Sequence, residues 1–290
     1  MAASSSDEDP ADAYRTEILA ACASGPAAEF CRFEVVAETD STNADVAAAA
    51  RRGEAEGLVV VADFQRAGRG RFGRRWVAPP GTALMFSLLL RPSEVPMERW
   101  PLLPLLAGVG VVRGLAATCG VRLGLKWPND VVDVGGRKLA GILVEAPPTE
   151  ASARAAVVVG IGLNVFLSTD MPPGATALNA LGVRPPSRGV ILRGILEEFL
   201  TRYRAWRNAE PEQVGAALAE YRRFCTTIGA EVEVELPGGE IVAGRAVDVT
   251  SNGALLVATT RGDVALNTAE VVRVRRVAVR PDLNGDTMPT

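Results

Sequence analysis

Up to about residue 226, apolar and polar positions follow two periods, and these predict strands interleaved with helices. Short apolar or β-branched runs predict strands, at residues 32–38, 58–64, 84–90 and 157–165. Longer stretches with helical spacing predict helices, at residues 14–23, 97–118, 187–207 and 211–224. We therefore expect a large domain of mixed α/β character.

Local signals add a helix, a hairpin and two loops. A polar break at 39–43 precedes an alanine-rich helix, which Ser41 or Thr42 is expected to cap and which is expected to end at Arg52. Two apolar runs separated by Gly135 and Gly136 predict a hairpin, at residues 131–134 and 139–145. Loops are expected at 65–81 and 168–186.

From Ile228 onward the pattern changes to that of a small all-β unit. Residues 231–236 alternate strictly, Pro237-Gly238-Gly239 supplies a turn, and three further short strand patterns follow by Val277. This pattern predicts a small β-barrel. Because so short a unit has a marginal core of its own, we expect it to pack against the large domain.

These patterns divide the chain into two domains and two tails. The expected segments are a disordered tail at 1–13, the large domain at 14–226, the small domain at 227–278 and a flexible tail at 279–290. The first residues lack the basic and apolar regions of a signal peptide. The apolar stretch 102–119 contains a proline, an arginine and three glycines, and it is expected to be a buried helix and not a membrane span. We expect a cytoplasmic protein that binds no membrane.

Composition excludes several kinds of chemistry. Because the net charge is −3, any nucleic-acid or anion site must be a local basic patch. Four scattered cysteines without a CxxC pair fit neither a disulfide framework nor a zinc site. The chain has no histidine, which excludes Ser-His-Asp and Cys-His arrangements, HExxH zinc sites and a histidine base. No metal site is predicted, and the remaining groups favour phosphate and nucleotide chemistry.

The first motif is the loop from Gln65 to Trp76, which contains five arginines within ten positions. Guanidinium groups match phosphate and carboxylate oxygens, and glycines let backbone amides approach a ligand closely. The loop therefore suits a polyphosphate. A solvated basic loop or an RNA contact ending in an aromatic residue would have the same composition.

The second motif is Lys126-Trp127-Pro128-Asn129-Asp130 with the segment 136–145 that follows it. Lys138 begins an apolar strand, where a lysine is ordinarily a solvent-facing edge residue. A cation there could also bind the oxygens of a transferring adenylyl group, which gain charge during reaction. Asp130 could pair with a basic residue, approach a nucleotide-bound magnesium, or be a structural turn residue.

Two weaker motifs complete the set. Gly160-Ile161-Gly162-Leu163-Asn164 places glycines in a buried strand, which indicates close approach of a ligand or tight strand packing. The Asp40-Ser41-Thr42-Asn43 segment is typical of a helix cap and could also bind a ligand.

In this order the four motifs resemble the biotin protein ligase family. That family has a Ser-Thr-Asn turn, a Gly-Arg-Gly-Arg loop ending in Trp, a Lys-Trp-Pro-Asn-Asp segment followed by Arg-Lys-Leu-Ala-Gly-Ile-Leu, and a Gly-x-Gly-x-Asn strand. The motifs cover residues 37–165, and the order of domains extends the resemblance to about Val277. It implies an α+β fold, in which a mixed sheet flanked by helices forms a class II aminoacyl-tRNA-synthetase-like catalytic domain and an SH3-like β-barrel follows it.

The resemblance also implies a two-step ligase reaction with biotin and ATP as substrates and Mg²⁺ carried with ATP. The biotin carboxylate attacks the α-phosphorus of ATP and pyrophosphate leaves; a lysine of an apo biotin carboxyl carrier protein or domain then attacks the adenylate. No covalent nucleophile on the enzyme is needed, which agrees with a chain that lacks histidine. The main task is to neutralise charge and align the reactants.

Carried over residue by residue, the resemblance assigns roles to twelve positions. Lys138 and Arg71 are the predicted catalytic residues; Lys138 would hold the reacting carboxylate and α-phosphate oxygens, and Arg71 would retain the adenylate. Residues predicted to bind the biotin substrate are Ser41, Thr42, Asn43, Gln65, Arg69, Gly70, Arg71 and Lys138. Residues predicted to bind the nucleotide are Arg69, Arg71, Arg74, Trp76, Asn129 and Asn164.

The chain departs from some members of the family in two respects. It has about 30 residues before the first core strand, whereas a winged helix-turn-helix needs about twice as many. We therefore expect a monofunctional ligase that binds no DNA, and we favour a monomer. Phe72 also stands where a further basic residue often occurs in the family.

Two other functions are weighed against this one. A lipoate protein ligase has the same fold class and the same adenylation chemistry, but it lacks this form of the Gly-Arg-Gly-Arg loop. A non-catalytic nucleotide- or RNA-binding protein could use the basic loop and Trp76, but it would need neither Lys138 in its motif nor the Ser-Thr-Asn turn.

Overall fold

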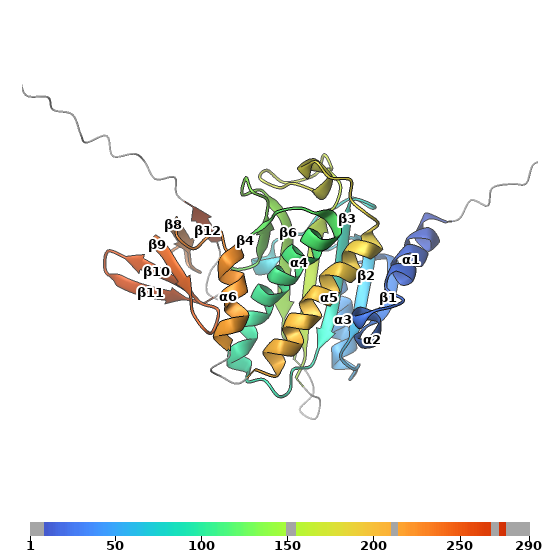
Figure 1. Cartoon of the computed structure of the whole chain (residues 1–290), viewed down its shortest axis with the longest axis horizontal. Helices are drawn as coiled ribbons and strands as arrows, with labels where there is room; N and C mark the ends of the chain where they lie inside the picture. The colour runs from blue at the N-terminus through green and yellow to red at the C-terminus, as the bar shows by residue number, and fades with distance from the viewer. Residues whose placement is uncertain (1–8, 149–154, 210–213, 268–272, 277–290) are drawn as a thin grey trace, which may run out of the picture.

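The computed structural model describes residues 9–148, 155–209, 214–267 and 273–276, and it contains two β-sheets. The larger sheet has seven strands in the order β1-β2-β3-β7-β6-β5-β4 (Figure 1). Strands β1 and β2 are parallel and the other neighbours are antiparallel, so the predicted mixed sheet is confirmed. The strands are β1 (Arg32–Thr39), β2 (Leu58–Gln65), β3 (Ala83–Leu90), β4 (Gly124–Lys126), β5 (Asp130–Val132), β6 (Lys138–Glu145) and β7 (Val157–Asn164).

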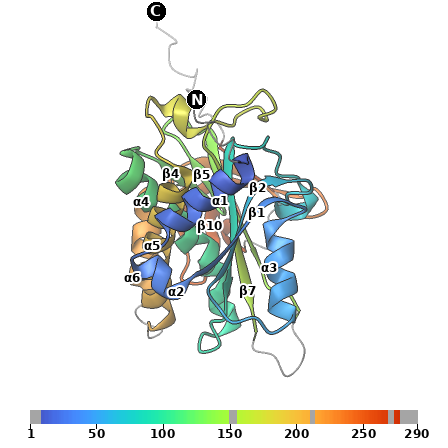
Figure 2. The same cartoon turned by 90° about the vertical axis from the view of Figure 1, so that its right-hand side faces the viewer.

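Helices cover both faces of this sheet (Figure 2). The period of β2 explains why: Leu58 and Val60 pack beneath the alanine-rich helix α3, whereas Val59 and Val61 join the core on the opposite face. The predicted hairpin is also confirmed, since β5 and β6 pair across the two glycines. The helices are α1 (Pro10–Ala21), α2 (Pro26–Phe30), α3 (Thr42–Arg51), α4 (Leu103–Cys119), α5 (Arg188–Arg207) and α6 (Val214–Phe224), with 3₁₀ helices η1 (Arg71–Gly73), η2 (Met97–Leu102) and η3 (Leu178–Leu181).

Two helix boundaries differ from the predicted ones because of proline and capping residues. Helix α1 begins at Pro10 and not at residue 14, because Asp9 accepts a hydrogen bond from the N–H of Ala11 and proline fits the first turn. Residues 10–13 are therefore helical and do not belong to the expected tail. The single helix expected at 97–118 is divided into η2 and α4, where Pro101 and Pro104 cannot donate backbone hydrogen bonds.

Among the described residues, the combined helix Met97–Cys119 is long and apolar enough to cross a membrane, but 67% of its apolar window is buried inside the fold. Helix α4 packs directly on α5. A Cβ atom at Gly110 would lie 2.8 Å from Cβ of Phe199, and one at Gly114 would lie 2.7 Å from Cα of Ile195. These glycines allow the close approach of the two helices.

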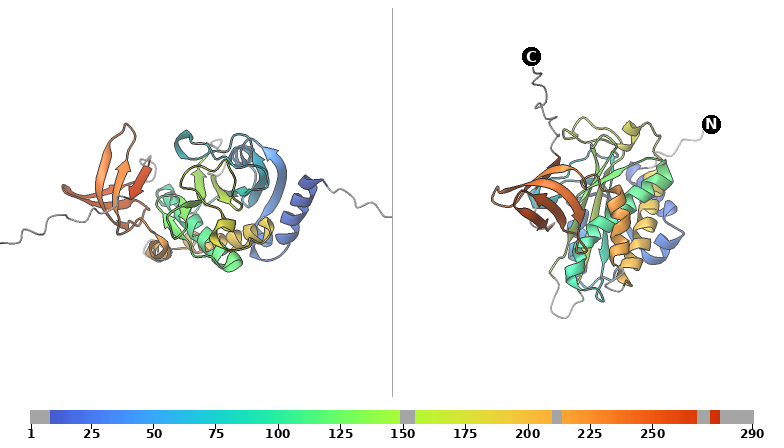
Figure 3. Two further views of the ribbon diagram at one scale, coloured as in Figure 1. Left: turned by 90° about the horizontal axis from the view of Figure 1, so that it is seen from above. Right: turned by 60° about the vertical axis from the view of Figure 1, so that its left-hand side comes forward.

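The second sheet forms a separate body beside α6 (Figure 3). It is antiparallel, with the order β11-β10-β9-β8-β12. Four strands follow β8 instead of the predicted three, and closure into an SH3-like barrel stays a prediction. The strands are β8 (Glu231–Glu235), β9 (Ile241–Val249), β10 (Leu255–Thr259), β11 (Gly262–Leu266) and β12 (Arg273–Arg276).

The expected packing of the small domain against the large one is confirmed by a shared core and by hydrogen bonds. The indole N–H of the buried Trp127 donates to the carbonyl of Gly253 at 3.0 Å, and its backbone N–H donates to Oγ1 of Thr227 at 3.0 Å. Arg222 donates through Nε to Asp248 at 2.7 Å. The Lys-Trp-Pro-Asn-Asp segment is thus held directly by the small domain.

Candidate functional site

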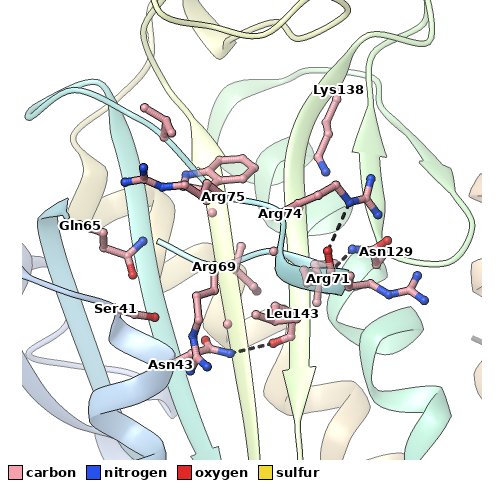
Figure 4. A pocket seen from close by; sticks show the side chains of 18 of the residues that line it. Ser41, Asn43, Gln65, Arg69, Arg71, Arg74, Arg75, Asn129, Lys138 and Leu143 are labelled. Carbon is pink, nitrogen blue, oxygen red and sulfur yellow. Dashed lines mark hydrogen bonds between the residues drawn. The ribbon is translucent and has the colours of Figure 1, made fainter. Parts of the chain in front are cut away.

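A cavity of about 310 Å³ is lined by the start of α3, the arginine-rich loop and strands β6 and β7 (Figure 4). Segments far apart in the sequence meet there, because β2, β3, β7 and β6 are successive neighbours in the sheet. All twelve residues predicted from the sequence line this one cavity: Ser41, Thr42, Asn43, Gln65, Arg69, Gly70, Arg71, Arg74, Trp76, Asn129, Lys138 and Asn164. Their individual roles stay predictions.

The Ser-Thr-Asn turn is built differently from the expected helix cap. Ser41 occupies the N-cap position of α3, but within the described part of the chain its side chain makes no capping bond. Instead Oε1 of Gln65 accepts a hydrogen bond from the N–H of Thr42 at 2.8 Å and one from its hydroxyl at 3.2 Å. The side-chain amide of Gln65 therefore stabilises the start of the helix, while Ser41 lines the cavity.

Buried polar side chains extend inward from this turn. Oγ1 of Thr42 lies 2.7 Å from Oγ of Ser87, and the Ser87 hydroxyl donates to Oδ1 of Asn43 at 2.6 Å. Nδ2 of Asn43 donates to Oε2 of Glu145 at 2.7 Å and to the carbonyl of Leu143 at 3.3 Å. Both the carboxylate partner and the hydroxyl partner of Asn43 were missed by the motif reasoning. Ser87 lies in no motif, and Glu145 ends the second motif segment without an assigned role.

The arginine-rich loop closes on itself over the cavity. The N–H of Gly70 donates to the carbonyl of Arg74 at 2.7 Å, and the N–H of Trp76 donates to the carbonyl of Gly68 at 2.9 Å. Arg66 faces away from the cavity, where it forms ion pairs with exposed carboxylates. The loop thus directs some of its cations inward and anchors another outside.

Positive charge is concentrated in the cavity although the chain as a whole is acidic. Five cationic side chains line it together with two carboxylates: Arg69, Arg71, Arg74, Arg75 and Lys138, with Asp130 and Asp170. Burial lowers the pKa of the Arg71 guanidinium, the neighbouring Arg74 lowers it further, and Asp130 acts in the opposite direction. The lining therefore carries more positive than negative charge, and the two carboxylates compensate part of it.

Lys138 is directed into the cavity and is not an edge residue turned to solvent. Its Nζ lies 2.5 Å from Oδ1 of Asp130 and 5.8 Å from the ring centroid of Trp76. Its backbone N–H donates to the carbonyl of Gly174 at 2.8 Å, so the 168–186 loop covers this end of β6. Of the possibilities open for Asp130, the structure supports pairing with a basic residue.

The glycines of β6 and β7 make room for side chains of the protein. A Cβ atom at Gly160 would lie 1.8 Å from Oδ1 of Asn43, and one at Gly162 would lie 2.6 Å from the indole of Trp76. Trp76 and Asn43 therefore rest on bare strand backbone. This explains the glycines as tight packing next to the cavity.

Two asparagines that line the cavity donate hydrogen bonds to backbone carbonyls of neighbouring segments. Nδ2 of Asn129 donates to the carbonyl of Ile142 at 2.8 Å, and Nδ2 of Asn164 donates to the carbonyl of Thr176 at 2.9 Å. Other lining residues were missed by the motif reasoning, among them Arg75, Phe86, Leu143 and Asp170. Arg75 could have been found from its place in the arginine cluster, whereas Asp170 reaches the cavity through a loop without a local signal.

Known proteins resemble the chain in both sequence and structure. Residues 35–164 match the biotin/lipoate A/B protein ligase family, and residues 227–274 match the biotin protein ligase C-terminal domain. A biotin--[acetyl-CoA-carboxylase] ligase of Mycobacterium tuberculosis is 41% identical over 249 residues, which cover 84% of this chain and 90% of that protein. The bifunctional ligase/repressor BirA of Bacillus spizizenii is 32% identical over 243 residues, which cover 82% of this chain and 72% of that protein.

A solved structure shows the same likeness. The biotin protein ligase from Aquifex aeolicus in complex with biotin and ATP aligns with a TM-score of 0.70 and 28% identity, covering 85% of this chain and 99% of that one. All twelve predicted site residues fall inside the matched segment 35–164.

Proposed function

The chain belongs to the biotin protein ligase family, and on that premise we propose how its cavity carries out ATP-dependent biotin ligation. The enzyme forms biotinyl-5′-AMP and pyrophosphate from biotin and ATP, and then transfers biotin to a protein lysine. One observation carries the proposal: residues from all four sequence motifs line a single cavity that five cationic side chains share.

In the first step a carboxylate oxygen of biotin forms a bond to the α-phosphorus of ATP. The bond from that phosphorus to the bridging oxygen breaks, and the electron pair leaves with pyrophosphate. The oxygens around the phosphorus gain charge in the transition state, so a cation fixed beside them lowers the barrier. We assign that task to Lys138, whose Nζ would exchange Asp130 for the reacting oxygens.

Arg71 is the second cation of the reaction. It is partly withdrawn from water, which strengthens its attraction for a phosphate compared with an exposed arginine. Arginine also stays protonated under these conditions and offers two parallel donors to an anion. We assign to Arg71 the retention of the adenylate between the two steps.

The two ends of the cavity are assigned to the two substrates. Ser41, Thr42, Asn43, Gln65, Arg69 and Gly70 would bind biotin, whose polar ring and carboxylate need both donors and acceptors. Arg69, Arg74, Trp76, Asn129 and Asn164 would surround the nucleotide. Trp76 supplies an aromatic surface held close to Lys138.

Mg²⁺ is expected to arrive with ATP as part of the substrate. Among the described residues no group of three or more Asp, Glu, His or Cys side chains could hold a metal ion, and Asp130 is paired with Lys138. ATP brings phosphate oxygens that bind Mg²⁺ well with few protein ligands. The residues present therefore fit a metal delivered by the nucleotide.

In the second step the amine of a carrier lysine attacks the carbonyl carbon of the adenylate. A C–N bond forms, AMP leaves with the C–O electron pair, and the proton that the amine loses passes to solvent. We propose that the acceptor is the apo biotin carboxyl carrier protein or domain of a biotin-dependent carboxylase. We also propose a cytoplasmic location, where the four free cysteines would stay reduced.

The alternatives from the sequence are less well supported. A non-catalytic RNA-binding protein does not require the Ser-Thr-Asn turn and Lys138 to line the same cavity as the basic loop. A lipoate ligase falls under the same broad family description, but the match at residues 227–274 is to the C-terminal domain of biotin protein ligases.

Incubation of the purified protein with Mg²⁺, labelled ATP, an apo carrier domain and either biotin or lipoate tests the function. We expect biotinyl-AMP and a labelled carrier with biotin, and neither acyl-AMP nor a labelled carrier with lipoate. Turnover with lipoate alone would establish the lipoate alternative. Absence of turnover with either acid would leave the nucleotide- or RNA-binding alternative.

A further inference from the structure

Glu145, the last residue of β6, connects two motifs that lie far apart in the sequence. Its Oε2 accepts a hydrogen bond from Nδ2 of Asn43 at 2.7 Å and lies 3.4 Å from Nη2 of Arg69. Asn43 belongs to the Ser-Thr-Asn turn and Arg69 to the arginine-rich loop. In Figure 4 the side chain of Arg69 extends from its loop to Asn43, beside Leu143. Glu145 therefore lies where both motifs meet.

Hydrogen-bond directions show that Glu145 fixes the orientation of the Asn43 amide. Oδ1 of Asn43 accepts from the Ser87 hydroxyl, and Nδ2 donates to Leu143 and to Glu145. A rotated amide would place Oδ1 against a carboxylate and a carbonyl, which can only accept. The Glu145 carboxylate makes that alternative unfavourable, because two acceptors would then face each other in a part-buried position.

The backbone around Asn43 leaves this side chain little freedom of its own. Asn43 is buried, and the missing side chain of Gly160 supplies the space that it occupies. The hydroxyl of Thr42 lies within hydrogen-bond distance of Ser87, which itself donates to Asn43, and it also donates to Gln65. A shift of Asn43 would therefore be transmitted to the residues that line the end of the cavity assigned to biotin.

The contact of Arg69 with Glu145 is longer than that of Asn43, at 3.4 Å compared with 2.7 Å. The Arg69 side chain is about half exposed, and Glu145 is the acidic partner with which it forms an ion pair. Exposed ion pairs contribute little to stability, so the pair with Glu145 has little value as a structural support. Its effect is to hold the guanidinium across the cavity, where a ligand carbonyl or carboxylate could accept from it.

We propose that Glu145 is a positioning residue for biotin binding, which fixes the Arg69 guanidinium and the Asn43 amide in the orientations that the ligand needs. The proposal rests on the proposed function, which assigns Asn43 to biotin and Arg69 to both biotin and the nucleotide. Glu145 itself does not line the cavity, and it acts through these two side chains. Its loss should therefore weaken biotin binding more than it changes the chemical step.

Glu145→Gln tests the proposal with little change of shape. The amide keeps an oxygen that can accept from Asn43, but it removes the charge that faces Arg69. We expect the KM for biotin in adenylate formation to rise about threefold to fivefold, since the pair with Arg69 is long and about half exposed and such pairs are worth at most about 1 kcal/mol. The kcat should stay within about twofold, since the side-chain contacts of Glu145 in the described part of the chain are to Asn43 and Arg69, which are assigned to binding.

Glu38→Gln is the matched control. Glu38 also lies near the end of a strand and forms an ion pair with an arginine of the same loop, Arg66, at 2.7 Å. That pair lies outside the residues that line the cavity. The KM for biotin should therefore not change in this variant, and both variants should keep the thermal midpoint of the parent chain within a few degrees.

A double variant with Arg69→Ala keeps the proposal testable even if Glu145→Gln loses stability. If Glu145 acts through Arg69, adding Glu145→Gln to Arg69→Ala should raise the KM for biotin by less than twofold further. If the double variant instead shows an increase of the KM for biotin equal to the product of the increases in the two single variants, the proposal is wrong. A fall of kcat together with a lower thermal midpoint would also overturn it, because a general structural role would then suffice.

The two proposals fail in distinguishable ways. If the parent chain makes no biotinyl-AMP, the proposed function is wrong. If the parent chain makes biotinyl-AMP and Glu145→Gln leaves the KM for biotin unchanged, the function stands and the role given to Glu145 is wrong.

Discussion

Asp130 interacts with two cationic side chains of the cavity, Lys138 and Arg71, and its negative charge compensates part of theirs. It forms an ion pair with Lys138 and opposes the effect of burial on the pKa of Arg71. Without substrate, this carboxylate compensates charges that would be costly to leave unpaired and partly desolvated. A phosphate that enters the cavity can take over the same cations, so binding exchanges one anion for another.

Arg71→Ala should release the adenylate prematurely. Loss of one charged hydrogen-bonding partner corresponds to about a tenfold to hundredfold faster dissociation of biotinyl-AMP. Rapid dilution followed by quantification of free biotinyl-AMP measures that rate. Arg66→Ala serves as the control, since Arg66 lies on the same loop but pairs with carboxylates outside the cavity. Equal retention of the adenylate by the Arg71 variant and the parent would contradict the role given to Arg71.

Residues with motif signals could be predicted from the sequence, and residues positioned by the sheet could not. Lys138, Arg69 and Asn43 carry signals of residue type and spacing, and the structure brings them to one cavity. Ser87 lies in a buried apolar strand, and its contact with Asn43 depends on the pairing of β3 with β7. Such a contact follows from strand order, which local patterns do not specify.

At the scale of elements, the hairpin of β5 and β6 determines where Lys138 points. The turn between these strands is held by Asp133, whose Oδ1 accepts from the N–H groups of Gly135 at 2.9 Å and Arg137 at 2.8 Å. Its other oxygen accepts from the Arg137 side chain at 2.7 Å. Burial alone would raise the pKa of Asp133, but the backbone and side-chain bonds from Arg137 outweigh it and keep the pKa below its usual value.

Asp133→Ala should lower the free energy of unfolding by about 2 kcal/mol, because it leaves two turn amides without their acceptor. Urea denaturation at pH 7 measures this difference. Val134→Ala in the same turn is the control, since Val134 is 90% exposed and should change stability by less than about 0.5 kcal/mol. An unchanged urea midpoint in Asp133→Ala would contradict the role given to this turn.

The lowered pKa of Asp133 also predicts how the difference in unfolding free energy between the parent chain and Asp133→Ala varies with pH. A lowered folded-state pKa means that the stabilisation is present above the unfolded pKa of about 3.9 and is lost as the pH falls through the folded value. The gap in stability between the parent chain and Asp133→Ala should therefore narrow below about pH 4. A gap that widens in acid would contradict the assignment.

Elements with strong periods were predicted well, and their ends less well. The hairpin and the alternating strands agree with the sequence, because side-chain burial fixes their period. Helix α2 has five residues, too few for a period. The division at Pro101 and Pro104 comes from prolines within an otherwise helical apolar pattern, and the period alone does not locate that break. The capping of α3 by Gln65 could not be predicted, because that residue lies in another element.

At the scale of the whole molecule, Trp127 is one of the contacts that join the small domain to the segment beside the cavity. Trp127 lies between the Lys126 strand and the Asn129-Asp130 segment, and it donates to Gly253 of the small domain. Gly253 has φ of +86°, a conformation that favours glycine and turns its carbonyl toward the indole. Movement of the small domain would therefore reach the residues around Lys138.

Trp127→Phe should weaken the coupling between the domains. It removes the indole N–H and leaves the Gly253 carbonyl without this partner, which costs about 1–2 kcal/mol. We expect the calorimetric transition to broaden on its low-temperature side, because the shared core and the pair of Arg222 with Asp248 still join the domains. Trp100→Phe is the control: its indole also donates to a backbone carbonyl, that of Val95, but within the large domain. A transition as narrow as that of the parent chain in the Trp127 variant would contradict the role given to Trp127.

Lack of DNA binding and a monomeric state stay predictions at this scale. The residues proposed to bind and activate the substrates all belong to the large domain of one chain, so the proposed reaction requires neither property.

The rate of biotinyl-AMP formation in a single turnover, compared between the parent chain and Lys138→Ala, tests the central claim most directly. We predict a fall of about a hundredfold to a thousandfold, the effect typical of removing one group that stabilises transition-state charge. Arg32→Ala is the matched control and should keep the parent rate, because Arg32 also begins a strand and pairs with a carboxylate at 2.5 Å, but outside the cavity. An unchanged rate in Lys138→Ala would contradict the claim that Lys138 is the electrostatic centre of the reaction.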